Sequence, residues 1–570
     1  MSNLLGVVGT GSATDAVIAA LSAVDETVTE IEVEEVENVD FAVVAGEVGS
    51  NRFARANRSG TPWLAVELGG VGGRSFPDVD AAVSGFAPDT ACFECLRARV
   101  AANAEETDGT EVTETDTAAT RFAGALAGRE AVTLRSGERS SVLGGVVEIP
   151  HAEHRLLPVP NCPACGDARD RTLGIDHSER TLDEAISRAE IALDERVGIV
   201  QSLGEVSSFP VPYYLANICK TAGFSDAQCA EQSAGVAGDW DEALMKALGE
   251  GMERYCAGIY RESEFGVARP SVLDDAVSPA KFVRPDDWKE VKNDELAWIP
   301  GRNLGTGNPV HLPAEFVHFP PLDARFKPAI TTGLGLGNST TEALLSGLYE
   351  VIERDATMLA WYSSFEPLGL HVEDEGFEEL AKRARAEKLD VTALLVTQDV
   401  DVPVVAVAVH REEEWPKFAV GSGANLDPDS AARSALSEAL QNWTELKLMG
   451  PDDAANAEGS IARYADFPKP VRELVAPETT IPSDSVGKSV AGGTAELRAV
   501  VSRASEAFAV YGARLTTRDV QSLGFEAVRV LAPEAQPLFT GEPFFGERAR
   551  TVPNELGFDS ELNREPHPYP

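Results

Sequence analysis

Four of the seven cysteines stand in two matched pairs. Cys92 and Cys95 are separated by two residues, and Cys162 and Cys165 repeat that spacing. Each pair can place two thiolates on one tight turn, and two pairs together complete the tetrahedral sulfur shell that Zn²⁺ prefers. Four protein ligands leave no open position for water, so the spacing predicts a structural zinc site. The alternative is four unrelated buried thiols.

Carboxylates recur in a second pattern farther along the chain. The word Glu-x-x-Glu-Arg occurs twice, 100 residues apart, and a shorter variant follows. The members are Glu250, Glu253, Arg254, Glu350, Glu353, Arg354, Glu438 and Gln441. On a helical projection the polar members of each word share one side and leucines occupy the other. We therefore expect three amphipathic helices, each with a stripe of oxygen ligands.

Glycine-rich runs precede all three helices. Ser233 lies in the first run, Asn338 in the second, and Gly421 opens the third. Backbone N–H groups at such turns suit phosphate oxygens, and facing carboxylates suit the Mg²⁺ that bridges those phosphates. One nucleotide between the three helices would account for all of these patterns, with Ser233 and Asn338 among its ligands. The other interpretation is three surface helices with acidic solvent faces.

The end of the sequence alternates prolines with other residues, at Pro566, Pro568 and Pro570. By composition this is a polyproline tail, which is typical of a disordered end or of a ligand for another domain.

Two kinds of element would position these residues. At the front, the apolar run Leu4–Val8, the turn Gly9-Thr-Gly11 and the helical pattern Ala13–Ala23 predict the first unit of a Rossmann-like α/β domain. Further strands are expected at Phe41–Ala45 and Pro62–Glu67. Thr14 stands where a third glycine is usual, which favours a tight turn over a phosphate site. From about Asp170 long amphipathic helices prevail, with strands at Thr392–Val396 and Val404–Val409.

Charge is the unusual feature of the composition. The 570 residues, enough for two or three domains, carry 49 Lys+Arg against 92 Asp+Glu, a net charge of −43. This balance argues against nucleic acid and anionic membranes as partners, because both require a basic patch. The acid is spread along the chain, which indicates a halophile surface or else a surface for a cationic partner. The sequence shows no apolar run of about 20 residues and no signal peptide, so we expect a cytoplasmic protein.

The part from about Asp170 onward resembles the YcaO family. The two Glu-x-x-Glu-Arg words and the segment Gly421–Gln441 follow the order of that family's nucleotide-binding motifs. The front resembles the ThiF-like domain that accompanies YcaO proteins in peptide-heterocycle (bacteriocin) biosynthesis, through Cys92–Arg99 and Asn161–Gly166. The resemblance implies an α/β chain with a Rossmann-like, zinc-binding ThiF-type domain at residues 1–168. A layered α/β YcaO domain at residues 169–570 would then bind ATP and Mg²⁺ and carry out catalysis.

Two details of the resemblance concern single positions. Many relatives have a lysine in the first glycine turn, where this chain has Val236; Lys246 could replace it at a phosphate, or could instead form an i, i+4 salt bridge with Glu250. In the azoline-forming branch of the family a terminal Pro-x-Pro-x-Pro enters the active site with its carboxylate. That likeness implies a catalytic role for Pro566, Pro568 and Pro570.

The reaction implied is ATP-dependent activation of a backbone amide in a ribosomally made peptide or protein. A Cys, Ser or Thr side chain attacks the carbonyl, its oxygen takes the γ-phosphoryl group, and loss of phosphate leaves a thiazole- or oxazole-type azoline. The alternatives are thioamide formation with a TfuA-like partner and a non-enzymatic role in ribosomal-protein methylthiolation. We also expect a homodimer and a sulfur-delivery or oxidoreductase partner. A winged-helix module for a leader peptide has no counterpart before the glycine turn, so leader-peptide binding by that family's usual route is not expected.

Overall fold

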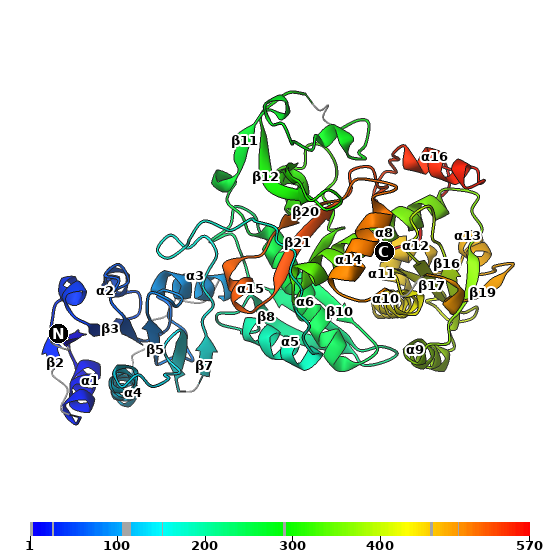
Figure 1. Cartoon of the computed structure of the whole chain (residues 1–570). Coiled ribbons are helices and arrows are strands. Elements are labelled where there is room, and N and C mark those ends of the chain that lie inside the picture. The colour runs from blue at the N-terminus through cyan, green and yellow to red at the C-terminus, as the bar shows by residue number, and fades with distance from the viewer. Residues whose placement is uncertain are drawn as a thin grey trace.

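The computed structural model describes residues 4–24, 28–104, 116–150, 152–288, 292–456, 460–487 and 490–570. An acidic, threonine-rich stretch at residues 105–117, for which composition favours a solvated loop, lies mostly outside the described residues. The molecule has a front part, up to Cys165, and a larger rear part, from Gly166 onward (Figure 1). No described helix has the length and apolar content needed to span a membrane.

One seven-stranded mixed sheet organises the front part, in the order β2-β1-β3-β4-β5-β6-β7. Its strands are β1 (Leu5–Val8), β2 (Val28–Glu30), β3 (Phe41–Glu47), β4 (Trp63–Leu68), β5 (Ala81–Phe86), β6 (Gly145–Ile149) and β7 (Ala152–Arg155). The first four strands are parallel, as a Rossmann-like entry predicts, whereas β5, β6 and β7 pair antiparallel. The antiparallel half was not expected from the sequence. The assignment to ThiF-like domains and the boundary at residue 168 stay predictions.

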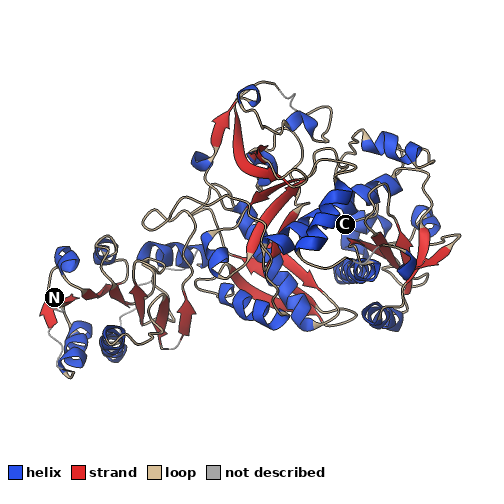
Figure 2. Cartoon of the chain, viewed as in Figure 1, coloured by secondary structure: helices blue, strands red, loops and turns tan. Residues whose placement is uncertain are grey.

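Helices cover both faces of the front sheet (Figures 1 and 2). Helices α1 (Ser12–Ser22) and α4 (Thr117–Arg135) pack together on one face, and α2 (Asn51–Ala56) and α3 (Phe93–Asn103) lie on the other. Gly9 has a φ of 131°, and a Cβ there would lie 2.8 Å from the Ala45 carbonyl oxygen. The glycine turn is thus explained by tight chain packing alone, as the sequence favoured.

Three sheets form the rear part. The first has the order β10-β9-β8, the second β11-β12-β20-β21-β14 with β13 beside β12, and the third β18-β17-β16-β15-β19. The first two comprise β8 (Val200–Ser207), β9 (Tyr213–Ile218), β10 (Gln232–Val236), β11 (Gly266–Ala268), β12 (Leu296–Asn303), β13 (Pro309–Pro313), β14 (Leu334–Gly337), β20 (Tyr511–Arg514) and β21 (Glu526–Leu531). The third comprises β15 (Leu368–His371), β16 (Asp390–Leu395), β17 (Val404–His410), β18 (Phe418–Ala424) and β19 (Thr480–Pro482).

Three long helices lie on these sheets, one on each: α6 (Trp240–Gly258), α8 (Thr340–Trp361) and α10 (Pro428–Met449). Their apolar sides contribute to the buried cores, and together with the sheets they give the layered α/β arrangement expected for this part (Figure 2). The remaining helices are α5 (Leu182–Ala189), α7 (Ala314–Val317), α9 (Glu375–Ala386), α11 (Pro451–Ala454), α12 (Ser460–Tyr464), α13 (Lys469–Leu474), α14 (Thr494–Ala504), α15 (Arg518–Ser522) and α16 (Arg548–Glu555).

A buried ion pair joins the two parts. Arg99 of α3 contacts Asp519 of α15, and both side chains are fully buried. The hydroxyl of Tyr255, on α6, donates to the same carboxylate at 2.7 Å. Because an unpaired buried charge is strongly destabilising, this pair holds α3 against α6 and α15.

Candidate functional site

Three strand–helix units frame the site: β10 with α6, β14 with α8, and β18 with α10. Each helix begins after a capping residue, namely Asp239, Ser339 or Asp427. The side chain of each cap accepts a hydrogen bond from the backbone N–H three residues later. Such caps satisfy one of the free N–H groups of the first turn. The Ser and Asp caps and the three helices match the sequence prediction.

The glycines of these units serve helix packing. A Cβ on Gly235, Gly335 or Gly421 would lie 2.1, 2.1 or 2.4 Å from a carbonyl oxygen of the helix that follows. No side chain fits at such distances, so each helix can lie directly on its strand only because glycine is present. Packing is therefore a sufficient reason for the glycine-rich runs, and these runs are not by themselves a sign of phosphate binding.

The first glutamate of each word is anchored in the same way. Glu250, Glu350 and Glu438 each accept a hydrogen bond from a backbone N–H 16, 17 and 16 residues upstream, at 3.0, 3.0 and 2.6 Å. The donors lie in or next to the strand of the same unit. One oxygen of each carboxylate is thus committed to the protein backbone. This shared bond is a structural repeat that fixes where the three carboxylates stand.

Two arginines link the carboxylates. Arg254 donates to Glu250 from two nitrogens, at 2.9 and 3.2 Å. Arg354 lies between the second and third units. Its nitrogens lie 3.9 Å from Glu350, 3.5 Å from Glu353 and 3.7 Å from Glu438. Arg354 therefore joins the second and third words, and the first word is coupled to the second through Glu253, whose pKa Glu350 acts to raise.

Burial makes two of the carboxylates unusually basic. Burial, with smaller contributions from Glu250 and Glu350, raises the pKa of Glu253 to about 8, although Arg254 acts to lower it. Burial also raises the pKa of Glu353 to about 7, although Arg354 and a 2.7 Å hydrogen bond from Ser422 act in the opposite direction. Both carboxyl groups are therefore protonated more readily than an exposed glutamate.

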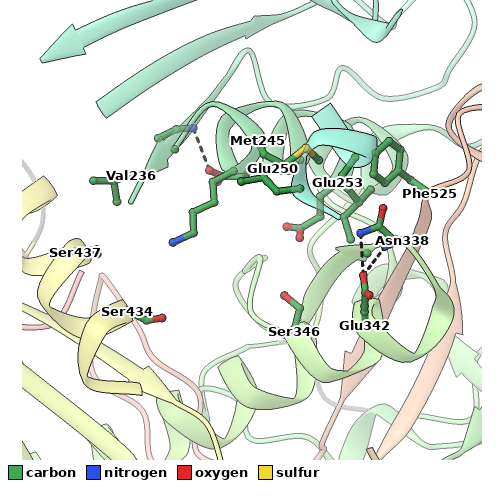
Figure 3. A pocket seen from close by; sticks show the side chains of 18 of the residues that line it. Val236, Met245, Glu250, Glu253, Asn338, Glu342, Ser346, Ser434, Ser437 and Phe525 are labelled. Atoms are coloured by element: carbon green, nitrogen blue, oxygen red, sulfur yellow. Dashed lines mark hydrogen bonds between the residues drawn. The ribbon is translucent and has the colours of Figure 1, made fainter. Parts of the chain in front are cut away.

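A cavity of about 700 Å³ opens between the three units. Figure 3 shows side chains entering it from all three helices: Met245, Glu250 and Glu253 from α6, Glu342 and Ser346 from α8, and Ser434 and Ser437 from α10. Its volume falls within the range of small-molecule sites. The predicted site residues that line it are Lys246, Glu250, Glu253, Asn338, Glu438 and Gln441.

The remaining predicted nucleotide ligands do not line this cavity. Glu350, Glu353, Arg254 and Arg354 stand behind it, within the charged cluster. Ser233 is buried, and its hydroxyl donates to the Ala247 carbonyl at 2.9 Å. This hydroxyl is therefore occupied within the β10–α6 unit, which gives Ser233 a packing role in place of the ligand role expected from its glycine run.

The sequence did not determine the hydrogen-bond partners of Asn338 or the role of Lys246. Asn338 donates to Glu342 from its backbone and its side chain, at 2.8 and 3.1 Å (Figure 3). Lys246 lines the cavity and also a neighbouring one of about 540 Å³. Within the described part of the chain it makes no ion pair with Glu250, which pairs with Arg254. The salt-bridge interpretation of Lys246 is therefore wrong.

The residues fit a magnesium nucleotide. Carboxylates are the protein ligands that Mg²⁺ prefers, and a bound cation would favour the charged form of Glu253, whose pKa is raised mainly by burial. Two buried polar atoms beside the cavity, Nη1 of Arg254 and Oδ1 of Asn338, have no hydrogen-bond partner in the described structure. Buried polar groups are normally paired, so a bound ligand would complete this site.

Several cavity residues were missed as ligands from the sequence. Arg180 and Thr181, at the start of α5, and Phe525, before β21, line the wall. No sequence pattern marks them, because they come from segments outside the three words. Ser422 and Glu342 also line it. Ser422 lies inside the third glycine-rich run, and Glu342 lies on the polar face of the second helix. These two sequence patterns could therefore have identified them.

The proline tail folds back onto α8. Arg354 Nη1 donates to the Pro570 oxygen at 3.3 Å, and Trp361 Nε1 donates to the Glu565 carbonyl at 2.8 Å. His567 and Tyr569 are each 1% exposed. The tail is thus packed, not solvated, and its last residue contacts the arginine that lies among the glutamates.

The four paired cysteines converge in the front part. Their sulfurs all lie within 4.8 Å of one another, and three pairs are 3.4 to 3.8 Å apart. This is somewhat wider than the ~4 Å limit that Zn–S bonds of about 2.3 Å require of every pair. The Val159 N–H donates to Cys95 at 3.3 Å, and Arg518 of the rear part donates to the Cys165 carbonyl at 2.6 Å. The cluster has the composition of a structural metal site.

Solved structures share this architecture. A heterocyclase in complex with substrate and cofactor aligns with 97% of this chain and 83% of its own, at a TM-score of 0.76 and 20% identity. The heterocyclase TruD aligns with 98% of this chain and 82% of its own, at a TM-score of 0.70 and 18% identity. At such identities the likeness concerns the fold.

Sequence comparisons address the family. A protein of Methanothermobacter thermautotrophicus described as uncharacterized is 29% identical over 329 residues, which cover 54% of this chain and 83% of that protein. A protein from the tfuA 3′ region of Rhizobium leguminosarum bv. trifolii is 24% identical over 305 residues, covering 49% and 70%. The model of the YcaO cyclodehydratase family, described as ATP- and Mg²⁺-binding, matches residues 234–536, more than half of the chain. The chain therefore belongs to the YcaO family.

Proposed function

We propose that this protein is an ATP- and Mg²⁺-dependent enzyme that cyclises Cys, Ser or Thr residues of a peptide or protein substrate to azolines. The observation that carries the proposal is the convergence of three glutamate-bearing helices on one cavity, with Arg354 between the glutamates of the second and third helices. Membership of a family described as ATP- and Mg²⁺-binding supports the same conclusion.

The carboxylates are assigned to magnesium. Glu253 lines the cavity and has a raised pKa, and a divalent cation would stabilise its charged form. Glu250, Glu350 and Glu438 keep one oxygen on the backbone, which holds each in place before any ligand arrives. Glu353 completes the set behind them. Lys246 and Gln441 are assigned to the nucleotide from the cavity wall.

Bound Mg²⁺-ATP would supply the phosphoryl group that turns the amide oxygen into a leaving group. The task of the protein is then to orient the peptide and to move protons: one leaves the attacking side chain and one leaves the amide nitrogen, for a net loss of water. We assign the tail of Pro566, Pro568 and Pro570 to this step, because the Pro570 oxygen lies on Arg354, beside the glutamates. Proline lowers the entropy lost when such a segment is ordered.

The test is ATP turnover with candidate substrates. Peptides rich in Cys, Ser and Thr, chosen from short reading frames beside the gene, would be incubated with the chain, ATP and Mg²⁺ at molar KCl. We expect phosphate release that depends on a peptide, and a peptide product lighter by one water for each phosphate released. Failure to bind Mg²⁺-ATP would overturn the assignment of the cavity, and turnover without loss of water would overturn cyclodehydration.

Thioamide formation is the second candidate. The observation that favours it is the 24% identical relative from a tfuA 3′ region, because TfuA-like proteins are the expected sulfur-delivery partners of that reaction. The mass of the product in the same assay separates the two reactions. With a sulfide donor and a TfuA-like partner, thioamide formation would replace one oxygen of the peptide by sulfur, and the product would not show the mass loss of one water that marks an azoline.

Other assignments are part of the proposal. We propose Zn²⁺ as the metal of the four-cysteine cluster, with a structural role, since four thiolates leave no open position. We also propose a ThiF-like origin for the front part, a homodimer, and an acidic surface adapted to high salt, as the net charge of −43 suggests.

A further inference from the structure

A second large cavity lies at the junction of the two parts. Its volume is about 840 Å³. The front part supplies the turn after β4, one side of α3 and the segment around Cys162, and the rear part supplies the segment after β9 and Arg261, which follows α6. It shares none of its lining residues with the cavity between the three helices.

The charge of this cavity is opposite to that of the chain. The whole sequence has 92 acidic against 49 basic residues, yet the cavity is lined by four cations and one carboxylate. The cations are Arg74, Arg97, Lys220 and Arg261, and the carboxylate is Glu94. This local excess of positive charge within a strongly acidic protein indicates a functional role for these cations.

Two of the four cations are already paired. Arg97 contacts Glu94 at 3.1 Å, and Arg261 contacts Asp226 at 2.6 Å. Arg74 and Lys220 make no ion pair with any described residue. They stand on opposite parts of the molecule, one in the turn after β4 and the other after β9. Two unpaired positive charges therefore face one space from its two walls.

The remaining wall is apolar. Its accessible surface comes from Ala98 and Ala101 of α3 and from Ala222, because Phe224 and Val159, which are 3% and 1% exposed, add almost none. Asn161 holds a left-handed turn, with φ of 57°, and its side-chain amide donates to the Phe224 carbonyl at 3.3 Å. This floor is therefore braced by the turn that precedes Cys162. A lone inorganic anion would leave most of such a surface without contact.

We propose that this junction cavity binds an acidic segment of the peptide or protein that the enzyme modifies. Carboxylates of the segment pair with Arg74 and Lys220, and its apolar side chains lie on the alanines of the apolar wall. The volume is within the range of ligand sites, and complementary charge favours encounter and orientation. The net charge of −43 opposes this little at molar salt, because exposed charges more than about 3 Å apart are then largely screened, whereas partly buried pairs are screened much less. Only the statement that the bound chain is a substrate rests on the proposed function.

The experiment measures peptide binding by the full chain without nucleotide. Fluorescence anisotropy would be recorded with a labelled octapeptide of alternating glutamate and leucine, and with the same peptide carrying glutamine for glutamate. We expect the acidic peptide to bind at least tenfold more tightly, and the double variant Arg74→Gln with Lys220→Gln to lose at least tenfold in affinity. The control Arg58→Gln with Lys281→Gln removes two exposed cations elsewhere and should change nothing.

Three results would overturn the proposal: equal binding of the two peptides, an equal loss in the control variant, or displacement of the acidic peptide by inorganic tripolyphosphate as effectively as by unlabelled peptide. The last would make the cavity a site for small anions. The variant Glu353→Gln should bind the peptide normally, because it lies in the other cavity's cluster. This inference and the proposed function can therefore fail separately.

Discussion

The two clusters of ligand-type side chains differ in how they are closed. The four cysteines stand on two short turns, with every sulfur within 4.8 Å of the others. The glutamates come from three helices: Glu250, Glu253 and Glu438 line a cavity of about 700 Å³, and Glu350 and Glu353 stand behind it. The first cluster can enclose a metal completely, whereas the second leaves space for a ligand that enters and leaves.

This difference in closure distinguishes a structural metal site from a catalytic site. A closed set of thiolates contributes folding free energy and does not exchange its partner. Glu250, Glu350 and Glu438 are each anchored by one backbone hydrogen bond, and Glu250 and Glu438 line the open cavity. Loss of a ligand should therefore unfold the front part in one case and stop turnover in a folded protein in the other.

The largest effect is expected for Cys95→Ser. Removing one of four thiolates should release the metal and cost several kcal/mol of folding free energy in the front part, because metal binding there is coupled to folding. Metal content by mass spectrometry and limited proteolysis of the front part would show it, while ATP affinity stays largely intact. The matched control is Cys229→Ser, a buried thiol outside the cluster, which should cost about 1–3 kcal/mol and keep the metal. A metal-loaded, protease-resistant Cys95→Ser protein would contradict a structural role.

The second prediction is that Glu353→Gln abolishes ATP turnover, by about 10³-fold or more, with little change in thermal stability. The amide keeps the size of the side chain and can still accept the Ser422 hydrogen bond, and one charge fewer relieves repulsion by Glu350 and Glu438. Steady-state phosphate release and thermal melting measure the two quantities. Glu506→Gln, an exposed position elsewhere, should leave both unchanged. Loss of folding together with turnover would place Glu353 with the structural cluster instead.

Deletion of the last five residues comes third. We expect turnover to fall by about 10² or more, the usual contribution of a positioned acid–base group, while ATP affinity barely changes. Because Tyr569 is buried, this deletion also removes core packing. Deletion of Pro570 alone keeps Tyr569 and removes the contact to Arg354, so it isolates the catalytic part. Unaltered turnover in the single deletion would favour thioamide formation or a scaffold role.

The smallest effect concerns the seam between the two parts. His154, on β7, bonds Asp194 of the rear part at 2.7 Å. Burial acts to lower the pKa of His154, but Asp194 and Glu148 outweigh it and raise this pKa to about 9. Because this pKa is raised above its unfolded value of about 6.5, protonated His154 stabilises the fold fully at pH values below about 6.5. This contribution to the free energy of unfolding, up to ~3 kcal/mol, is lost as the pH rises through about 9.

Melting curves between pH 6 and 10 would check this sign. The wild-type protein should lose stability toward pH 10 relative to its value at pH 6, and His154→Gln should be less stable at pH 6 and show a flatter profile. Parallel profiles for the two proteins would mean that this contact contributes nothing to the junction.

The elements of the site were largely readable before any coordinates. The three expected amphipathic helices form and begin at Trp240, Thr340 and Pro428, because helical periodicity and capping depend on residues that are neighbours in the sequence. The antiparallel half of the front sheet was not expected, since pairing of β5 with β6 joins segments about sixty residues apart. Arg180 and Phe525 were missed for the same reason: residues far apart in the chain meet at one cavity.

The sequence alone determined those contacts that depend only on local backbone geometry. The spacing of two residues puts Cys92 beside Cys95, and a rise of one helical turn puts Glu250 beside Arg254, whatever surrounds them. Only the tertiary structure decided which residues from distant segments form ion pairs or hydrogen bonds: Arg354 with Glu438 and Pro570, and Arg99 with Asp519. The physical reason is that burial and Coulomb interactions depend on distance in space, which the fold sets and the order of residues does not.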